Sequence, residues 1–352
     1  MERLINLLEE PYMHTYFACV QNLSIGHFLP HQGSIMRLFQ ALSNLQTLSL
    51  NTIIPKLRRT TSNEVYGVFP VNEFLDAHLP ASITTLNIRD CTIGSFSQLC
   101  TMLSSLPRLS VLRLSGWIGI WRGCDTNIGM HPDLNLEHLV LQGLNDWCAD
   151  ALMKSMLSTR IMQSLKYLGF KHCACSVSVL VEFLARLHSV EMLNIAFSVQ
   201  EDAREFLETF SVPRSSSLPS TLEVLQISLD RDGTTSLNMG LLADLLDNLT
   251  CSGLKTLHLC FDADILAGES MDEIAERLDP LSRMGNILGK GFFRGLSLVL
   301  VKFSGRRHSS INYEVVQCLM RVIQHRVCCS RPSAGPQVQL IVYDEDTRFY
   351  GL

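Results

Sequence analysis

An apolar triplet recurs along the chain, with hydrophobic residues at its first, fourth and sixth positions. Ten segments carry it, beginning at Val20, Leu45, Ile83, Leu109, Leu136, Leu165, Val190, Leu222, Leu254 and Phe293. Most of them start 25 to 32 residues after the one before, and two gaps of 38 and 39 residues imply loop insertions. Alternation of apolar and polar residues around each triplet predicts a short strand with one buried face. Val338, Leu340 and Val342 predict a last, less regular strand.

Between the triplets, apolar residues recur at spacings of three and four, which predicts amphipathic helices. The predicted helices cover residues 34–42, 95–106, 145–157, 177–187, 201–210, 237–249, 271–281 and 311–325. In the second of them, Ser95 and Gln98 have the spacing of a capping box, and Pro107 ends the helix because proline cannot continue it.

One strand and one helix of this length cannot bury enough apolar surface alone. Stacking the units side by side gives each triplet a neighbour above and below, so we expect the strands to pair in parallel through crossover helices. Because helices are wider than the spacing between strands, the stack should curve with the strands inside.

The spacing L-x-x-L-x-L-x-x-C at residues 83–91 and 165–173 resembles the leucine-rich repeat, with cysteine at the consensus turn position. The phrases L-P-A-S-I-T-T-L-N-I and L-P-S-T-L-E-V-L-Q-I resemble those of fungal F-box-like leucine-rich-repeat proteins. The resemblance covers about residues 16 to 345. It implies an α/β leucine-rich-repeat solenoid, a curved horseshoe with a concave parallel β-sheet and helices on the convex side. It also implies a role in substrate recognition for a ubiquitin ligase.

Two features depart from that family. The 19 residues before the first triplet contain no motif of the L-P-x-E kind that opens an F-box. We therefore expect ubiquitin-ligase components as partners only if an F-box is supplied elsewhere. In several repeats the turn position holds neither cysteine nor asparagine, so these turns must close differently; the residues are Ile53, Trp117, Leu144 and Ser198.

We expect a single continuous domain: an N-terminal capping helix at residues 1–19, a repeat array at 20–300, and a C-terminal helix and closing strand at 301–352. The N-terminus alternates charges with leucines, which is unlike a signal peptide, and no long uncharged apolar run predicts a membrane span. The twelve cysteines lack disulfide spacing and are expected to be reduced. We therefore expect an intracellular protein, cytoplasmic or nuclear, without a membrane partner.

Charge and motifs point away from several functions. The net charge of −5 has no basic block, which argues against nucleic acid as the main partner. The segment K-H-C-A-C at residues 171–175 lacks the second ligand pair of a structural zinc site. Residues 230–241 lack the closing glutamate of a calcium loop, and the glycines at 289–295 precede a strand rather than a helix. We expect no cofactor, no metal and no enzymatic activity.

The remaining candidate is the concave face, to which alternation sends positions 3, 5 and 7 of each strand. This face is nearly uncharged, and its larger side chains define the predicted partner-binding residues: Arg89, Arg113, His138, Tyr167 and Lys171. Arginine and aromatic residues are the usual anchors of protein interfaces. The sequence therefore predicts a non-enzymatic scaffold that binds a protein partner, which it does not identify.

Two alternatives remain open. One is a hydrolase whose site lies in the long loops around Trp121 or Phe292, although no G-x-S-x-G or comparable motif marks a nucleophile. The other is an extracellular recognition module, which would carry disulfides and glycans at Asn22 and Asn248.

Overall fold

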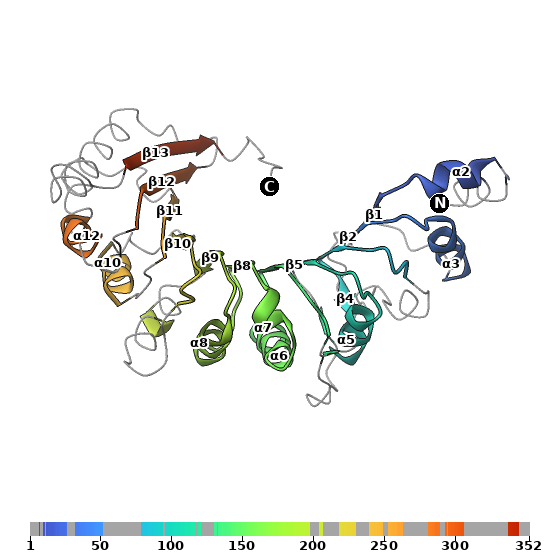
Figure 1. The fold of residues 1–352 in the computed structure, drawn as a ribbon, viewed down its shortest axis with the longest axis horizontal. Helices are drawn as coiled ribbons and strands as arrows, with labels where there is room; N and C mark the ends of the chain where they lie inside the picture. The colour runs from blue at the N-terminus through green and yellow to red at the C-terminus, as the bar shows by residue number, and fades with distance from the viewer. Residues whose placement is uncertain are drawn as a thin grey trace, which may run out of the picture. The chain divides into compact units, whose positions relative to one another are not determined.

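The structure is a computed structural model. It describes residues 7, 10, 12–26, 32–51, 79–93, 96–116, 119–120, 130–131, 133–197, 204–206, 218–229, 239–248, 253–262, 281–288, 293, 295–305 and 337–344. Figure 1 draws the helices and strands along the chain. The chain divides into two compact units. The first comprises residues 1–169 and 173–176, and the second residues 170–172 and 177–352. The division falls within strand β8 (Tyr167–Lys171), so Tyr167 belongs to the first unit and Lys171 to the second.

The first unit is built on parallel strands in the order β1 (Asn22–Gly26), β2 (Thr47–Asn51), β3 (Thr85–Arg89), β5 (Val111–Ser115) and β7 (His138–Gln142). The register sets equivalent triplet positions side by side, as in the row Leu23, Leu48, Leu86, Leu112 and Leu139. A second parallel pair joins β4 (Thr92–Ile93) to β6 (Gly119–Ile120). The predicted stacking of the apolar triplets is therefore confirmed in this unit.

The described helices of the first unit are α2 (Met13–Ala18), α3 (Gln32–Ala41), α5 (Phe96–Ser104), α6 (Asp146–Met156) and α7 (Ile161–Ser164). The side chain of Asn145 caps α6, because its Oδ1 accepts a hydrogen bond from Cys148 N at 2.9 Å. Most triplet residues of the strands are buried together with the apolar stripes of α5 and α6, although Val20 and Leu23 are only partly buried. The intervening strand residues are intermediate or exposed, apart from Gly169 of β8. We call the sheet face that carries those intervening residues the helix-free face.

The second unit repeats the arrangement with β9 (Met192–Phe197), β10 (Val224–Leu229), β11 (Thr256–Asp262), β12 (Leu298–Gly305) and β13 (Gln337–Asp344), all parallel neighbours in that order. Its described helices are α8 (Val177–Arg186), α10 (Met239–Asn248) and α12 (Leu281–Leu288). Arg283 of α12 forms an ion pair with Asp244 of α10 at 2.7 Å. The register again aligns the triplets, as in Leu193, Leu225 and Leu257.

The core consists of these aligned triplets. Leu45, Leu86, Leu112, Leu139 and Leu193 have no exposed surface, and a fully buried aliphatic side chain contributes roughly 1.5–3 kcal/mol. Parallel strands in sequence order, joined by helices on one face, make the fold an α/β leucine-rich-repeat solenoid, as the sequence predicts. The division of residues into caps and array stays a prediction.

The residue after the strand adopts a left-handed conformation in four successive repeats. These residues are Asp90 (φ 50°), Gly116 (φ 76°), Gly143 (φ 66°) and His172 (φ 49°). Glycine reaches this region without strain, and aspartate and histidine are among the side chains that tolerate it best. Asp90 N donates to Ser115 O at 2.9 Å, and Gly116 N donates to Gln142 O at 2.8 Å. The turn thus carries the hydrogen-bond ladder one residue beyond the strands.

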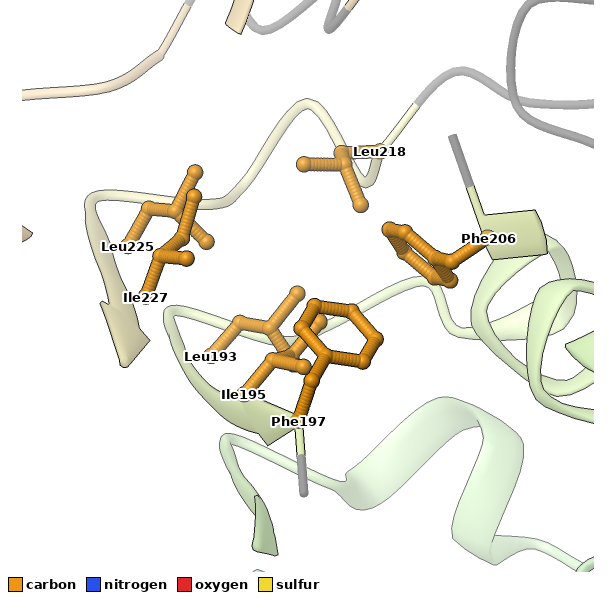
Figure 2. Close-up of a pocket in the computed structure, with 7 residues that line it drawn as sticks. All are labelled: Leu193, Ile195, Phe197, Phe206, Leu218, Leu225 and Ile227. Carbon is orange, nitrogen blue, oxygen red and sulfur yellow. The ribbon is translucent and has the colours of Figure 1, made fainter. Parts of the chain in front are cut away.

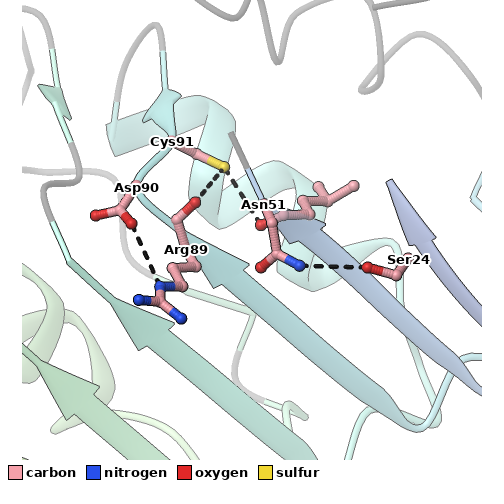
Figure 3. Close-up of polar contacts among 6 residues, drawn as sticks. Ser24, Asn51, Arg89, Asp90 and Cys91 are labelled. Atoms are coloured by element: carbon pink, nitrogen blue, oxygen red, sulfur yellow. Dashed lines mark hydrogen bonds and ion pairs between the residues drawn. The ribbon is translucent and has the colours of Figure 1, made fainter. Parts of the chain in front are cut away.

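The next residue turns inward. Cys91 is fully buried, and its thiol lies 3.2 Å from Arg89 O and 3.5 Å from Leu50 O in the preceding repeat (Figure 3). Leu144 occupies the same place after Gly143 and is 2% exposed. The prediction that this turn closes differently therefore needs refinement: the backbone turns alike and a buried leucine replaces the polar side chain. Ile53, Trp117 and Ser198 lie outside the described residues.

A hydroxyl group just before the strand links three pairs of repeats. Ser82, Ser164 and Thr221 each immediately precede a triplet, and each donates to the carbonyl of the first triplet residue in the repeat before. Ser82 donates to Leu45 O at 2.7 Å, Ser164 to Leu136 O at 2.7 Å, and Thr221 to Val190 O at 2.9 Å. Two of these hydroxyls lie in the L-P-A-S and L-P-S-T phrases, which thereby acquire a structural role.

One predicted triplet is wrong. Leu257 is in register with Val299 and Leu259 with Val301, so the tenth triplet is Leu296, Val299 and Val301 rather than Phe293, Leu296 and Leu298. Leu298 instead lies beside Thr256, which is on the helix-free face. In the segment L-S-L-V-L-V, apolar residues occupy both odd and even positions. The pattern therefore does not show which residues face the core and which lie on the helix-free face. The predicted helices at 271–281 and 311–325 lie outside the described residues, apart from Leu281 at the start of α12.

Candidate functional site on the helix-free face of the sheet

In the first unit, four of the five predicted site residues lie on the helix-free face. Arg89, Arg113, His138 and Tyr167 come from β3, β5, β7 and β8. The rings of His138 and Tyr167 stack, with centroids 5.7 Å apart and an interplanar angle of 23°. We call Arg113, His138, Val140, Tyr167 and Gly169 the aromatic patch. The patch combines the stacked aromatic pair with the exposed Arg113, which lies beside Val140 in register.

The lack of a side chain at Gly169 accounts for the direction of the Tyr167 ring. A Cβ at Gly169 would be 3.3 Å from both Cε1 and the hydroxyl oxygen of Tyr167, and 3.5 Å from Cγ1 of Val140. The tyrosine ring therefore extends along its own strand and covers Gly169, which is buried although it occupies the helix-free face. A larger residue at 169 would require the ring of Tyr167 to shift slightly.

Arg113 lies between polar and apolar neighbours. Its register partners are Asn87 on β3 and Val140 on β7. Asn87 Nδ2 donates to Ser49 Oγ at 3.0 Å, and Asn51 Nδ2 donates to Ser24 Oγ at 3.2 Å. These bonds form an uncharged polar strip on β1, β2 and β3, so the charge in this part of the face comes from the two arginines.

Arg89 is held at the edge of this face by its neighbour in sequence. Its Nε lies 3.3 Å from Oδ2 of Asp90, and 69% of the arginine side chain is exposed (Figure 3). An exposed ion pair of this kind adds little stability. Its effect is to orient the guanidinium group at the end of β3.

The fifth predicted residue, Lys171, belongs to the second unit. His172 N donates to Ala196 O at 2.9 Å. In the first unit Asp90 N donates to Ser115 O in the same way, and there Arg89, the residue before Asp90, is the register partner of Ser115. Lys171 therefore lies beside Ala196 on the helix-free face. Burial lowers the pKa of Lys171 from its ordinary value, the charge of Lys302 adds to that lowering, and Cys260 opposes it.

Sequence reasoning missed Lys302. Its Nζ lies 3.5 Å from Nδ1 of His258, and burial and this lysine lower the pKa of His258 to about 4. The corrected tenth triplet places Lys302 at its seventh position, a helix-free position equivalent to Cys260. A triplet read from Leu296 would have found it.

The other sequence candidates lie in a turn or largely outside the described residues. His172 is a left-handed turn residue and Cys173 is 5% exposed, which agrees with a structural role for K-H-C-A-C. The described part of the chain contains no group of three metal-binding side chains. The calcium-like segment lies outside the described residues, apart from Met239, Gly240 and Leu241 in α10, and so does the glycine segment at 289–295, apart from Phe293 and Gly295. Trp121 and Phe292 lie outside them entirely.

A small cavity lies inside the core of the second unit (Figure 2). Its lining is wholly apolar: Leu193, Ile195, Phe197, Phe206, Leu218, Leu225 and Ile227. Phe197 and Phe206 pack with centroids 5.2 Å apart. The described lining residues offer no polar group that could orient a substrate or hold a bound water, so the cavity supplies no candidate for chemistry.

Comparisons with known proteins leave the family open. No family model matches the chain, and no curated protein matches it. Among solved structures, it is similar to an internalin (InlF) from Listeria monocytogenes, with 12% identity and a TM-score of 0.32, over 97% of this chain and 89% of that one. A likeness of this degree carries no argument about function, and the fold class rests on the register and turns described above. No described helix is long and apolar enough to cross a bilayer.

Proposed function

We propose that the protein is a non-enzymatic scaffold that binds a protein partner through the helix-free face of its sheet. The observation that carries the proposal is the aromatic patch, where the stacked rings of His138 and Tyr167 lie on the same face as Arg113. Tyrosine and arginine are the residue types that dominate interface energetics, because each buries a large rigid surface and offers directed hydrogen bonds.

The balance of charge favours a protein over nucleic acid. The net charge is −5, whereas a nucleic-acid surface needs a basic stripe to displace counterions. Arg89 and Arg113 are separated by uncharged side chains, including Asn87 and Ser115, so they suit single carboxylate or carbonyl groups of a partner.

The test removes the patch without touching the core. Partners captured by the intact protein are identified by mass spectrometry, and one is purified for direct titration. Replacing Arg113 and Tyr167 together by alanine should weaken its binding by at least about tenfold, the size expected for two interface anchors. Lys154→Ala, an exposed change on α6, is the matched control and should leave binding unchanged. Equal affinity for the double variant and the control would remove the proposal.

A narrower role is substrate recognition for a ubiquitin ligase, and its support is the sequence resemblance alone. In that role the helix-free face would hold the substrate, while an F-box supplied elsewhere would bind the ligase adaptor. Ligase subunits should then appear among the captured proteins and should persist when the aromatic patch is mutated. Their absence from capture under conditions that retain the substrate would exclude this role and leave the scaffold proposal intact.

A further inference from the structure

Strand β1 ends the row of parallel strands in the first unit, so on one side it has no neighbouring strand among the described residues (Figure 1). On its other side it pairs with β2, where Thr47 N donates to Gln21 O at 2.9 Å. The main-chain groups of successive residues alternate between the two sides of a strand. Three residues of β1 therefore direct their N–H and C=O groups away from β2: Asn22, Ser24 and Gly26.

These outward groups are accessible to solvent. Asn22, Ser24 and Gly26 are all exposed, and because glycine has no side chain, the exposure of Gly26 is that of the main chain itself. The strand also lacks the usual protection of a sheet edge, since its sequence N-L-S-I-G contains neither a charged residue nor a proline. We call the outward side of β1 the open edge.

The apolar ladder of the core also ends at β1 without full cover. Leu48 and Leu86, at the second triplet position, have no exposed surface. Leu23 is in register with Leu48 but is only partly buried, as is Val20 at the first position of the same triplet. One more apolar side chain beside Leu23 would remove this remaining surface from water.

The main chain and the core of β1 favour the same kind of ligand. An extended polypeptide carries N–H and C=O groups at the spacing of a strand, and its alternate side chains lie on one face. If the residues on that face are apolar, the segment covers Leu23 while its main chain bonds to the open edge. Strand addition of this kind is a general mode of peptide recognition.

A second copy of the chain fits the open edge less well. Pairing β1 with its own copy about a two-fold axis would join five residues on each side, whereas a specific interface between folded proteins takes about 20–30 residues a side. A peptide segment needs fewer residues, because main-chain hydrogen bonds supply much of its affinity.

We propose that the open edge binds an extended segment of a protein partner as an additional strand. The segment exchanges main-chain hydrogen bonds with Asn22, Ser24 and Gly26, and its alternate residues are apolar and cover Leu23. This site goes beyond the proposed function, because it uses the edge of the sheet and not the helix-free face. Each surface can therefore be tested without the other.

The probe is a labelled peptide with the sequence of residues 81–90 of this chain, A-S-I-T-T-L-N-I-R-D, which carries the apolar spacing of a repeat strand. The comparison peptide exchanges its leucine with the following asparagine, so that apolar residues lie on both faces. Fluorescence anisotropy with the full chain should show saturable binding with a Kd below about 1 mM, and several-fold weaker binding of the comparison peptide. Absence of binding at that concentration, or equal binding of the two peptides, would overturn the inference.

Variants of Ser24 locate the binding. Ser24→Pro removes an outward N–H group at a position where an edge strand tolerates proline, and it should weaken binding of the probe at least about tenfold. Ser24→Ala is the matched control, because it loses the same hydroxyl and its bond to Asn51 but keeps the N–H group. Thermal unfolding verifies that both variants fold. Equal affinity of the two folded variants would overturn the inference.

Amide hydrogen exchange in the unaltered protein tests the same claim without a substitution. In the free protein, the amides of Leu23 and Ile25 should exchange slowly because they face β2, and those of Asn22, Ser24 and Gly26 should exchange fast. Saturation with the probe should slow exchange at these three residues. Unchanged exchange there in the bound protein would place the peptide elsewhere and overturn the inference.

Two further measurements separate this site from other surfaces. Replacing Arg113 and Tyr167 by alanine should leave the affinity for the probe unchanged, and a loss of affinity would place the peptide on the helix-free face. Light scattering should show no dimer that Ser24→Pro abolishes, and such a dimer would assign the open edge to a second copy. If the probe fails to bind while a partner still requires Arg113 and Tyr167, only this inference falls. If the probe binds and the aromatic patch proves dispensable, the scaffold proposal loses its stated surface while the open edge stands.

Discussion

The carboxylate of Asp90 occupies the space where a side chain at Gly116 would begin. A Cβ at Gly116 would lie 1.9 Å from Oδ1 and 2.7 Å from Cγ of Asp90, and Gly116 also has φ of 76°. The two residues hold equivalent turn positions in successive repeats. Glycine at 116 is thus required twice, by its own backbone conformation and by the aspartate of the repeat before.

This relationship predicts that Gly116→Ala destabilises more than Gly143→Ala. Gly143 has φ of 66°, but a Cβ there meets nothing nearer than 3.7 Å, so it isolates the backbone strain. We expect Gly143→Ala to lower the free energy of unfolding by about 1–2 kcal/mol, and Gly116→Ala by a clearly larger amount. Urea denaturation measures both. In an Asp90→Gly background, the cost of Gly116→Ala should fall to that of Gly143→Ala; equal costs in both backgrounds would contradict the clash.

The hydroxyl links between repeats predict a second effect. Ser82→Ala and Ser164→Ala should each lower the free energy of unfolding by about 1 kcal/mol, because a carbonyl of the preceding repeat loses its side-chain donor. Ser43→Ala is the control, since Ser43 is exposed and takes part in this contact only through its carbonyl. Denaturation midpoints for Ser82 and Ser164 variants that match the control would show that the hydroxyls contribute nothing.

Buried thiols of the first unit should resist alkylation. Burial raises the pKa of Cys100 to about 11 and, with a smaller contribution from Cys173, that of Cys148 to about 12. Both are therefore protonated at pH 8, where the exposed Cys19 has access to reagent. Iodoacetamide followed by peptide mapping should label Cys19 first, and Cys100 and Cys148 only after unfolding. Equal labelling of the three in the native protein would contradict their burial.

The same shifts affect stability at high pH. Because the folded pKa of Cys148 exceeds its ordinary value of 9.0, the unfolded chain loses this proton first. The contribution is complete below about pH 9 and is lost as the pH rises toward 12. Cys148→Ala should flatten this part of the stability profile relative to the unaltered protein, and identical slopes for the two would refute the shift.

His258 predicts the opposite dependence at low pH. Its folded pKa of about 4 lies below the ordinary value of 6.5, chiefly through burial and then through the charge of Lys302. Its contribution to stability is present above pH 6.5 and is lost as the pH falls toward 4. Nuclear magnetic resonance titration of the imidazole should report the low pKa, and Lys302→Gln should raise it. A pKa near 6.5 in the unaltered protein would contradict the arrangement of these two residues.

The repeats could be predicted from the sequence because burial in the core requires apolar residues at regular positions. Leu48, Leu86 and Leu112 each need a partner in the neighbouring repeat, so the spacing of leucines carries the register directly. The same reasoning failed at residues 293–301, where Leu298 and Leu300 are apolar yet lie at helix-free positions. Their parity could not be read from hydrophobicity, and Lys302 was missed in consequence.

The site was only partly predictable. Alternation places Arg113, His138 and Tyr167 on one face, but their contacts depend on side-chain direction, which spacing does not encode. The ring of Tyr167, which stacks on His138, also lies over Gly169, where a Cβ would come within 3.3 Å of it, two residues away on the same strand. A glycine in a strand can mark a bulge, a bend or a close approach, and the sequence does not tell which. Here Gly169 allows the close approach of the Tyr167 ring.

Site-specific photo-cross-linking can show whether a protein partner binds the helix-free face. A photoreactive residue replaces Val140, in the aromatic patch, or Lys154, on the exposed side of α6. We expect the partner to be cross-linked from position 140 and not from position 154. Cross-linking from 154 with none from 140 would contradict it.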